Sequence, residues 1–231
     1  MQKSIDTLRF LGLDMINEAN SGHPGIVLGA APMLYELFTN HLNIAPSHPN
    51  WFNRDRFVMS AGHGSALIYA MLHLAGYSLT IEDLKAFRSL NSKTPGHPEY
   101  HLTEGLDMTT GPLGQGLSHA VGMAMAESHL RAKYSTPNYP VMDHYTYVLA
   151  SDGDLQEGVS FEALSLAGHL KLNRLIVLFD SNDIQLDGPV SNSASLNIQG
   201  YVESLGLDYQ RVDDANDTER IKEALEFAKK S

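Results

Sequence analysis

The sequence predicts an α/β fold with a doubly wound, mainly parallel sheet and helices on both of its faces. Two apolar runs, YTYVLA at 145–150 and LIVLF at 175–179, have the length and composition of buried strands. Strand, helix and strand in this order form the crossover unit of a parallel sheet. The segment between the two runs carries apolar residues at roughly helical spacing: Leu155, Val159, Phe161, Leu164, Leu166, Ala167 and Leu170.

The same alternation of helices and strands continues on both sides of this unit. Thr80 and Asp217 have side chains that can cap the helices following them. The segment 91–112 has little periodicity, and a loop of this length in a compact domain is usually functional or disordered. The remaining predicted helices span 4–20, 26–42, 65–75, 81–87, 117–134, 198–205 and 218–230, and the remaining strands span 56–60 and 207–212.

The composition is that of a soluble globular protein of one domain. The chain has 231 residues, of which 43% are hydrophobic and 19% are charged, and its formal net charge is −11. This acidic balance argues against nucleic-acid binding through phosphate neutralisation. The absence of cysteine excludes disulfides and thiolate metal sites. Because the N-terminus lacks a signal-peptide core and no apolar stretch approaches about 18 residues, we expect a cytoplasmic protein that does not enter a membrane.

Oxygen-bearing side chains follow both strands of the crossover unit. The first strand ends in SDGD (151–154) and the second in DSND (180–183). Open parallel sheets bind ligands beyond the carboxyl ends of their strands, so we expect Asp152 and Asn182 to share a hard cation. Gly153 has no Cβ and would let a phosphate approach the backbone. These residues predict a magnesium–diphosphate site, although Asp, Asn and the pair Asp-Gly are also ordinary turn residues.

Three of the eleven histidines lie in turns flanked by Gly or Pro, which can aim a ring into a cleft: His23, His63 and His97. A neutral imidazole can donate a hydrogen bond to a diphosphate or sugar oxygen and can relay protons near neutral pH. We expect the other eight to be surface or packing residues. Zinc is disfavoured because none of the three has a second ligand at a characteristic spacing. The sequence also lacks G-x-G-x-x-G, P-loop and G-x-S-x-G motifs, which weakens nucleotide-binding and serine-hydrolase interpretations.

Five segments together resemble the transketolase family. In order and spacing they are similar to the N-terminal, diphosphate-binding domain of these thiamine diphosphate enzymes. The resemblance covers essentially the whole chain and implies the thiamine diphosphate-binding fold over residues 1–231. The segments are ANSGHPG (19–25), WFNRDRFVMSAGHGS (51–65), SKTPGHPEY (92–100), TTGPLGQG (109–116) and SDGDLQEG with FDSND (151–183).

This resemblance implies a cofactor site built around the two turns. Asp152, the side chain of Asn182 and the main-chain oxygen of Ile184 would bind Mg²⁺, which Ca²⁺ or Mn²⁺ can replace. Asn182 also belongs to the cofactor-binding residues, among which His63 and the N–H of Gly153 would contact the diphosphate. The residues that would line the cofactor near its rings are Gly111, Pro112 and Leu113.

The resemblance also implies catalytic roles. His23 and His97 match residues that bind the donor ketose and help to move protons as its C2–C3 bond breaks. Glu157 matches a carboxylate that belongs to a glutamate network across a dimer interface. The implied reaction transfers a two-carbon ketol unit from a ketose phosphate to an aldose phosphate. The cofactor supplies the carbanion chemistry, and the protein supplies position and electrostatics.

The sequence departs from the family pattern in residue type and in length. Ser151 stands where the family usually has Gly, so it would bring a Cβ and a hydroxyl close to the cofactor, and Ser181 replaces a common Asp. The family's pyrimidine-binding and C-terminal domains, and the last strand of this domain, would lie beyond residue 231. The chain would therefore carry half of a site, and we expect activity to need a complementary C-terminal half. The expected protein partners are a second copy in a homodimer, this C-terminal half, or both.

Two other functions stay open. The chain could bind thiamine diphosphate and Mg²⁺, or some partner, without turnover. It could instead belong to another thiamine-dependent glycolaldehyde transferase, such as a dihydroxyacetone synthase or a deoxyxylulose-phosphate synthase. The segments WFNRDRF and TPGHPEY argue against this last interpretation.

Overall fold

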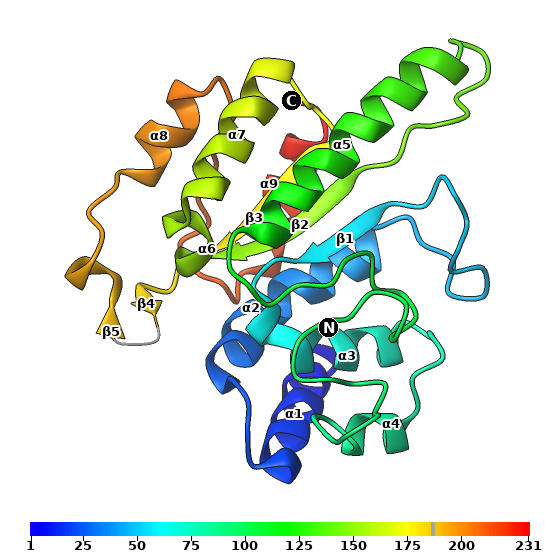
Figure 1. The fold of residues 1–231 in the computed structure, drawn as a ribbon, viewed down its shortest axis with the longest axis vertical. Coiled ribbons are helices and arrows are strands. Elements are labelled where there is room, and N and C mark those ends of the chain that lie inside the picture. Colours follow the sequence, from blue (N-terminus) through cyan, green and yellow to red (C-terminus); the bar gives the residue numbers. More distant parts are fainter. Residues whose placement is uncertain (186–187) are drawn as a thin grey trace.

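The computed structural model describes residues 1–185 and 188–231. In this part of the chain, parallel strands form a three-stranded sheet in the order β1-β2-β3 (Figure 1). A separate two-stranded ladder is antiparallel. The predicted α/β class with a mainly parallel sheet is confirmed. The strands are β1 (Arg56–Met59), β2 (Thr146–Ser151), β3 (Leu175–Asp180), β4 (Ile184–Gln185) and β5 (Gly188–Pro189).

The parallel sheet is apolar on both of its faces. Val58 lies beside Val148, which lies beside Val177, and all three belong to one hydrophobic cluster. Successive side chains of a strand point to opposite faces, so their neighbours belong to a second cluster. This second set contains Phe57, Met59, Tyr147, Leu149, Ile176 and Leu178. A sheet of this kind needs helices on both faces.

Helices cover both faces of the sheet, as predicted (Figure 1). The crossover connections through α5 and α7 run over the same face, which agrees with a strand order that follows the chain order. This face carries α5 (Gln115–Tyr134), α6 (Asp152–Gln156), α7 (Gly158–Leu170) and α8 (Ile198–Ser204). The opposite side carries α1 (Gln2–Ala19), α2 (Pro24–Glu36), α3 (Ser65–Leu74), α4 (Ile81–Lys85) and α9 (Thr218–Ala228).

The predicted helix over 26–42 divides into two parts, because α2 is followed by the π-helical turn η1 (Leu37–His41). The buried carboxylate of Glu36 lies at this junction. It accepts hydrogen bonds from Asn40 Nδ2 at 2.9 Å and bonds to His41 Nε2 at 3.2 Å. The 3₁₀ turns found in the described residues are η2 (Gly62–Gly64) and η3 (Val190–Asn192). Across the described ranges, no helix is both long and apolar enough to cross a membrane.

Both predicted helix caps are confirmed. Thr80 Oγ1 accepts a hydrogen bond from Asp83 N at 3.1 Å, and the Asp83 carboxylate accepts one from Thr80 N at 2.8 Å. This reciprocal pair is a capping box at the start of α4. The carboxylate of Asp217 accepts a hydrogen bond from Arg220 N at 3.1 Å at the start of α9.

The predicted strand over 207–212 is wrong. Residues 205–210 alternate between half-buried and exposed, which is the pattern of a strand with one buried face. A strand also needs a neighbour that pairs with its backbone groups. Among the residues that the structure describes, β3 pairs with β2 alone, so its second edge is open and the segment after α8 stays irregular.

Candidate functional site

The carboxyl ends of β2 and β3 meet at one edge of the sheet, where the sequence predicts a cation site. Asp152 directly follows β2 and opens α6, while Asn182 lies two residues beyond the end of β3. The backbone N–H groups of Asn182 and Asp183 donate hydrogen bonds to Oδ2 of Asp152, at 3.0 and 3.1 Å. The two turns are therefore in direct contact.

The side chain of Asn182 is held within its own turn. Its Oδ1 accepts a hydrogen bond from Ile184 N at 3.0 Å, and its Nδ2 donates one to Asp180 Oδ2 at 3.1 Å. Ile184 opens β4 and is exposed. The three expected metal ligands, Asp152, Asn182 and the main-chain oxygen of Ile184, thus belong to two turns that touch.

Two carboxylates at this edge are buried. The residues Asp152 and Asp180 are each 8% exposed, and within the described residues neither forms an ion pair with Lys or Arg. Burial raises the pKa of both carboxyls above their ordinary value, and it outweighs the hydrogen bonds that each accepts. Buried carboxylates normally need a positive partner, so this edge has the electrostatic character of a cation site.

The donor set fits magnesium better than zinc. It offers a carboxylate, an amide oxygen and a main-chain oxygen, and hard cations such as Mg²⁺ and Ca²⁺ prefer oxygen ligands. Zinc sites are instead built from His, Cys and carboxylates in groups of three or four. In the described part of the chain, His, Asp and Glu side chains form no such group of three or more.

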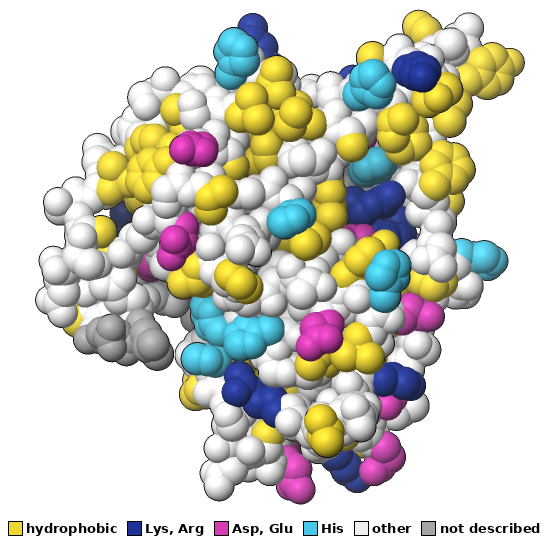
Figure 2. Space-filling model, in the orientation of Figure 1, with side chains coloured by type: hydrophobic (Ala, Val, Ile, Leu, Met, Phe, Trp, Pro, Cys, Tyr) yellow, Lys and Arg dark blue, Asp and Glu magenta, His cyan; other side chains and the backbone are white. Residues whose placement is uncertain are grey.

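The three histidines singled out in the sequence lie close together on one side of this edge. His23 precedes the first residue of α2, and His63 lies in η2. Their rings meet edge to face with centroids 5.2 Å apart. His97 lies in the loop over 91–112 and is in contact with Gly111. A Cβ built on Gly111 would be 3.3 Å from Cγ of His97. Figure 2 shows histidine side chains gathered beside basic ones on this face.

Each of these histidines has a lowered pKa. Burial lowers the pKa of His23 and His97, and the positive charge of Arg88 lowers both further. Burial is also the main cause for His63, with a further lowering from His23. The three rings are therefore neutral at pH 7. A neutral imidazole has one N–H donor and one acceptor nitrogen, so each ring can hold or pass on a proton.

The TTGPLGQG loop (109–116) connects the histidines to the two turns. A Cβ on Gly62 would lie 2.7 Å from Gly111 N, so the turn that carries His63 is in backbone contact with this loop. Two residues further along the loop, Leu113 approaches the turn of Asp152, because a Cβ on Gly153 would lie 2.9 Å from Cδ1 of Leu113. Pro112, between Gly111 and Leu113, is exposed. The expected cofactor-lining residues therefore lie between the histidines and Asp152.

Glu157 lies at the border of this group. It is exposed at the junction of α6 and α7, and a Cβ on Gly114 would lie 2.8 Å from its Cβ. Throughout residues 1–185 and 188–231, its carboxylate forms no hydrogen bond or ion pair. Val159, two residues later, is 43% exposed. The structure thus brings the histidines, the loop over 109–116 and the expected metal ligands together, and it leaves Glu157 facing outward.

Comparison with known proteins now decides the family. The family model described as transketolase, thiamine diphosphate binding domain, matches residues 1–231. The chain belongs to the transketolase family. Its fold and the thiamine diphosphate-binding nature of its domain agree with the resemblance seen in the sequence.

Curated transketolases are similar to this chain over its whole length. The transketolase of Bacillus subtilis strain 168 is 56% identical over 230 residues, which are 100% of this chain and 34% of that protein. The transketolase of Staphylococcus aureus strain MRSA252 is 58% identical over 228 residues, which are 99% of this chain and 34% of that protein. The chain spans about a third of the length of these relatives.

Solved transketolase structures share the fold. The enzyme from Leishmania mexicana has a TM-score of 0.98 at 49% identity, and the match covers 99% of this chain and 34% of that one. A Pichia stipitis transketolase in complex with sedoheptulose 7-phosphate has a TM-score of 0.97 at 48% identity, with the same coverage.

Two residues of this transketolase domain were not singled out in the sequence. Arg88 lies near His23 and His97, adopts a positive φ of 61°, and donates a hydrogen bond through Nη1 to Ser21 Oγ at 2.9 Å. Asp154 is fully buried behind the turn of Asp152. Nothing local indicates the position of Arg88, whereas the spacing Ser151-x-x-Asp154 is a capping-box pattern that could have identified Asp154.

Proposed function

We propose that this chain is the cofactor-binding part of a transketolase. With a complementary C-terminal part, it would transfer a two-carbon ketol unit from a ketose phosphate to an aldose phosphate. The main support for this proposal is a continuous set of contacts. It runs from His23 and His63, through the loop over 109–116, to Asp152 and Asn182. The names of its relatives and the sugar phosphate complex of the Pichia stipitis enzyme support the same reaction.

In this proposal the two touching turns hold the metal. Asp152, the amide oxygen of Asn182 and the main-chain oxygen of Ile184 would bind Mg²⁺, or Ca²⁺ or Mn²⁺ in its place. Support comes from the buried carboxylates of Asp152 and Asp180, which lack a cationic side chain in the described structure and have raised pKa values. A divalent ion would compensate their charge.

The loop and the neighbouring turns would hold thiamine diphosphate. His63 can donate a hydrogen bond to the diphosphate, and the N–H of Gly153 belongs to the turn that carries Asp152. Gly111, Pro112 and Leu113 would line the cofactor near its rings. When bound, the cofactor supplies the carbanion chemistry of the transfer, while the protein fixes its position and excludes water.

His23 and His97 would contact the sugar. Each is neutral at pH 7, so each can accept a proton from a sugar hydroxyl on its free ring nitrogen and later return it. Glu157, exposed and without a partner among the described residues, would act across an interface with a second subunit. Its exposed neighbour Val159 supports an interface at the start of α7. A homodimer is therefore part of the proposal.

Calorimetric titration with thiamine diphosphate and Mg²⁺ tests the binding part. We expect binding that is lost when Mg²⁺ is chelated and that thiamine, which lacks the diphosphate, does not reproduce. No binding by a folded chain would contradict the proposal for this chain on its own.

Turnover of xylulose 5-phosphate with ribose 5-phosphate tests the catalytic part. We expect none from this chain alone and activity once the complementary C-terminal part is added. If the mixture stays inactive while the chain binds the cofactor, the alternative is a thiamine diphosphate-binding module without turnover. Transfer to a different acceptor would instead favour another thiamine-dependent glycolaldehyde transferase.

A further inference from the structure

Asp154 is a fully buried carboxylate that lies behind the candidate metal ligand Asp152. Its Oδ1 accepts hydrogen bonds from Ser60 Oγ at 2.7 Å and from Gly114 N at 2.9 Å. Its Oδ2 accepts hydrogen bonds from Ser151 N at 2.9 Å and from Ser151 Oγ at 3.0 Å. Both oxygens are thus occupied by donors.

These donors come from three segments that are far apart in the sequence. Ser60 follows β1, Gly114 belongs to the loop over 109–116, and Ser151 is the last residue of β2. Ser60 Oγ also accepts a hydrogen bond from Leu117 N at 2.9 Å, which connects the first turn of α5 to Asp154 through Ser60. The carboxylate of Asp154 therefore joins the loop to the turn of Asp152 and Gly153.

The hydroxyl of Ser151 points toward Asp154. Ser151 Oγ donates a hydrogen bond to Asp154 Oδ2 at 3.0 Å within the capping box at the start of α6. Ser151 and Asp154 thus act as a pair, and the serine adds a bond to the buried carboxylate.

We propose that Asp154 is a positioning residue, which fixes the turn of Asp152 and Gly153 relative to the loop over 109–116. This inference rests on the function proposed above and assigns no contact with cofactor or substrate to Asp154. The role requires a carboxylate, because only an ionised carboxylate accepts on both oxygens without donating. An asparagine has almost the same size, but its NH₂ group would face N–H and O–H donors and leave at least one of them buried without an acceptor.

The variant Asp154→Asn tests this role, with Asp55→Asn as its matched control. Asp55 is also buried and also accepts backbone hydrogen bonds, from Asn43 N at 2.8 Å and Tyr145 N at 2.7 Å. It lies at the opposite edge of the sheet, before β1. For Asp154→Asn we expect affinity for thiamine diphosphate with Mg²⁺ to fall about 10- to 100-fold, the usual loss for residues that support metal ligands. Asp55→Asn should lower stability and leave this affinity within about twofold of the unsubstituted chain.

Hydrogen exchange gives a second readout that needs no cofactor. Asp154→Asn should accelerate exchange at the amides of Gly114 and Ser151, whereas Asp55→Asn should not. If Asp154→Asn fails to fold, Ser151→Ala removes a single donor and should show the same two effects on a smaller scale. A folded Asp154→Asn with unchanged exchange at both amides, or with affinity equal to that of Asp55→Asn, overturns the inference. If the unsubstituted chain itself does not bind the cofactor, the proposed function fails, and exchange alone decides the role of Asp154.

Discussion

Gly62 lies so close to Gly111 that a Cβ built on Gly62 would be 2.7 Å from Gly111 N and 2.9 Å from its Cα. Both partners are backbone, so neither can move aside as a flexible side chain would. We expect Gly62→Ala to lower the free energy of unfolding by about 1–3 kcal/mol, as overpacking usually does. Urea denaturation measures this change. Gly122→Ala is the control, because nothing lies within 4 Å of its Cβ and alanine should stabilise α5 by about 0.5–1 kcal/mol.

If Asp152 binds the metal as proposed, Asp152→Asn should remove most of the Mg²⁺-dependent affinity for thiamine diphosphate. The loss should be at least about 100-fold, because the substitution removes a metal ligand and not a residue that supports one. The neutral amide keeps an oxygen that can accept the hydrogen bonds of Asn182 and Asp183, so the turn itself should survive. Calorimetric titration at saturating Mg²⁺ measures the loss. Asp183→Asn is the control, because asparagine tolerates its positive φ of 57° and the side chain is exposed. Equal losses in both variants would show that general charge, not ligation, matters.

Arg88→Met should raise the pKa of His97 and of His23. The positive charge of Arg88 disfavours the protonated form of both rings, so its removal favours protonation. Methionine keeps an unbranched apolar stem of similar length. NMR titration of the imidazole resonances measures the change, and His129, which is exposed on α5, serves as the internal reference. An unchanged pKa of His97 in Arg88→Met would contradict this prediction.

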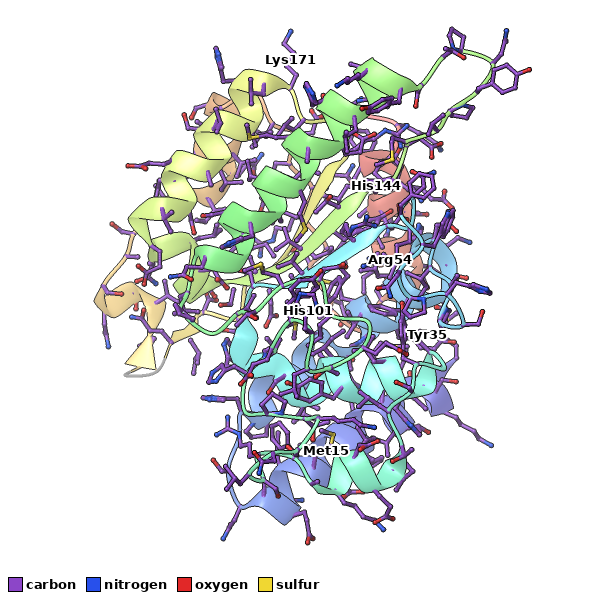
Figure 3. The ribbon with its side chains drawn as sticks, turned by 45° about the vertical axis from the view of Figure 1, so that its right-hand side comes forward. Met15, Tyr35, Arg54, His101, His144 and Lys171 are labelled. Atoms are coloured by element: carbon purple, nitrogen blue, oxygen red, sulfur yellow. The ribbon has the colours of Figure 1, made fainter. Side chains whose placement is uncertain are left out.

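His144→Phe should reduce the loss of stability in mild acid. Burial and then the charges of Arg56, Arg174 and Arg54 lower the pKa of His144 from 6.5 to about 4. Figure 3 shows His144 and Arg54 on the side of the sheet where the strands begin. Below pH 6.5 the unfolded chain binds a proton that the folded chain does not, so His144 lowers stability as pH falls from about 6.5 toward 4.

Denaturant unfolding at pH 7 and pH 5 measures this effect. The difference between the two pH values should be smaller for His144→Phe than for the unsubstituted chain, by at most about 1.4 kcal/mol per pH unit. Equal pH dependence in His144→Phe and the unsubstituted chain would contradict this prediction. It would mean that His144 takes up its proton in the folded chain at the same pH as in the unfolded chain.

Much of the candidate site could be predicted from the sequence, because parallel strands place their carboxyl ends together. That rule alone predicted the contact between the turns of Asp152 and Asn182. The glycine- and proline-flanked turns likewise indicated His23 and His63, whose rings do meet. The strand ends and the turns can be recognised from short stretches of sequence, and the fold class then determines how they lie relative to one another.

The residues that sequence reasoning missed depend on distant partners. The buried carboxylate of Asp154 accepts hydrogen bonds from Ser60, 94 residues earlier in the chain, and from Gly114 in the intervening loop. The wrong strand over 207–212 has the same cause, because alternation of side chains cannot reveal whether a neighbouring strand exists. The division of the helix after Glu36 also escaped notice, since it depends on how Asn40 and His41 reach a buried carboxylate.

The wide sequence separation across the sheet has a consequence for how the chain folds. Asn53 bonds to Asp143, 90 residues later, just before β1 and β2 pair. Contacts of this kind close long loops, so folding should take milliseconds to seconds, not microseconds. Since the site draws on segments from His23 to Ile184, it can exist only after these pairings are complete. Cofactor binding should therefore appear late in the refolding kinetics, and the bound cofactor would report the fraction of molecules that have folded completely.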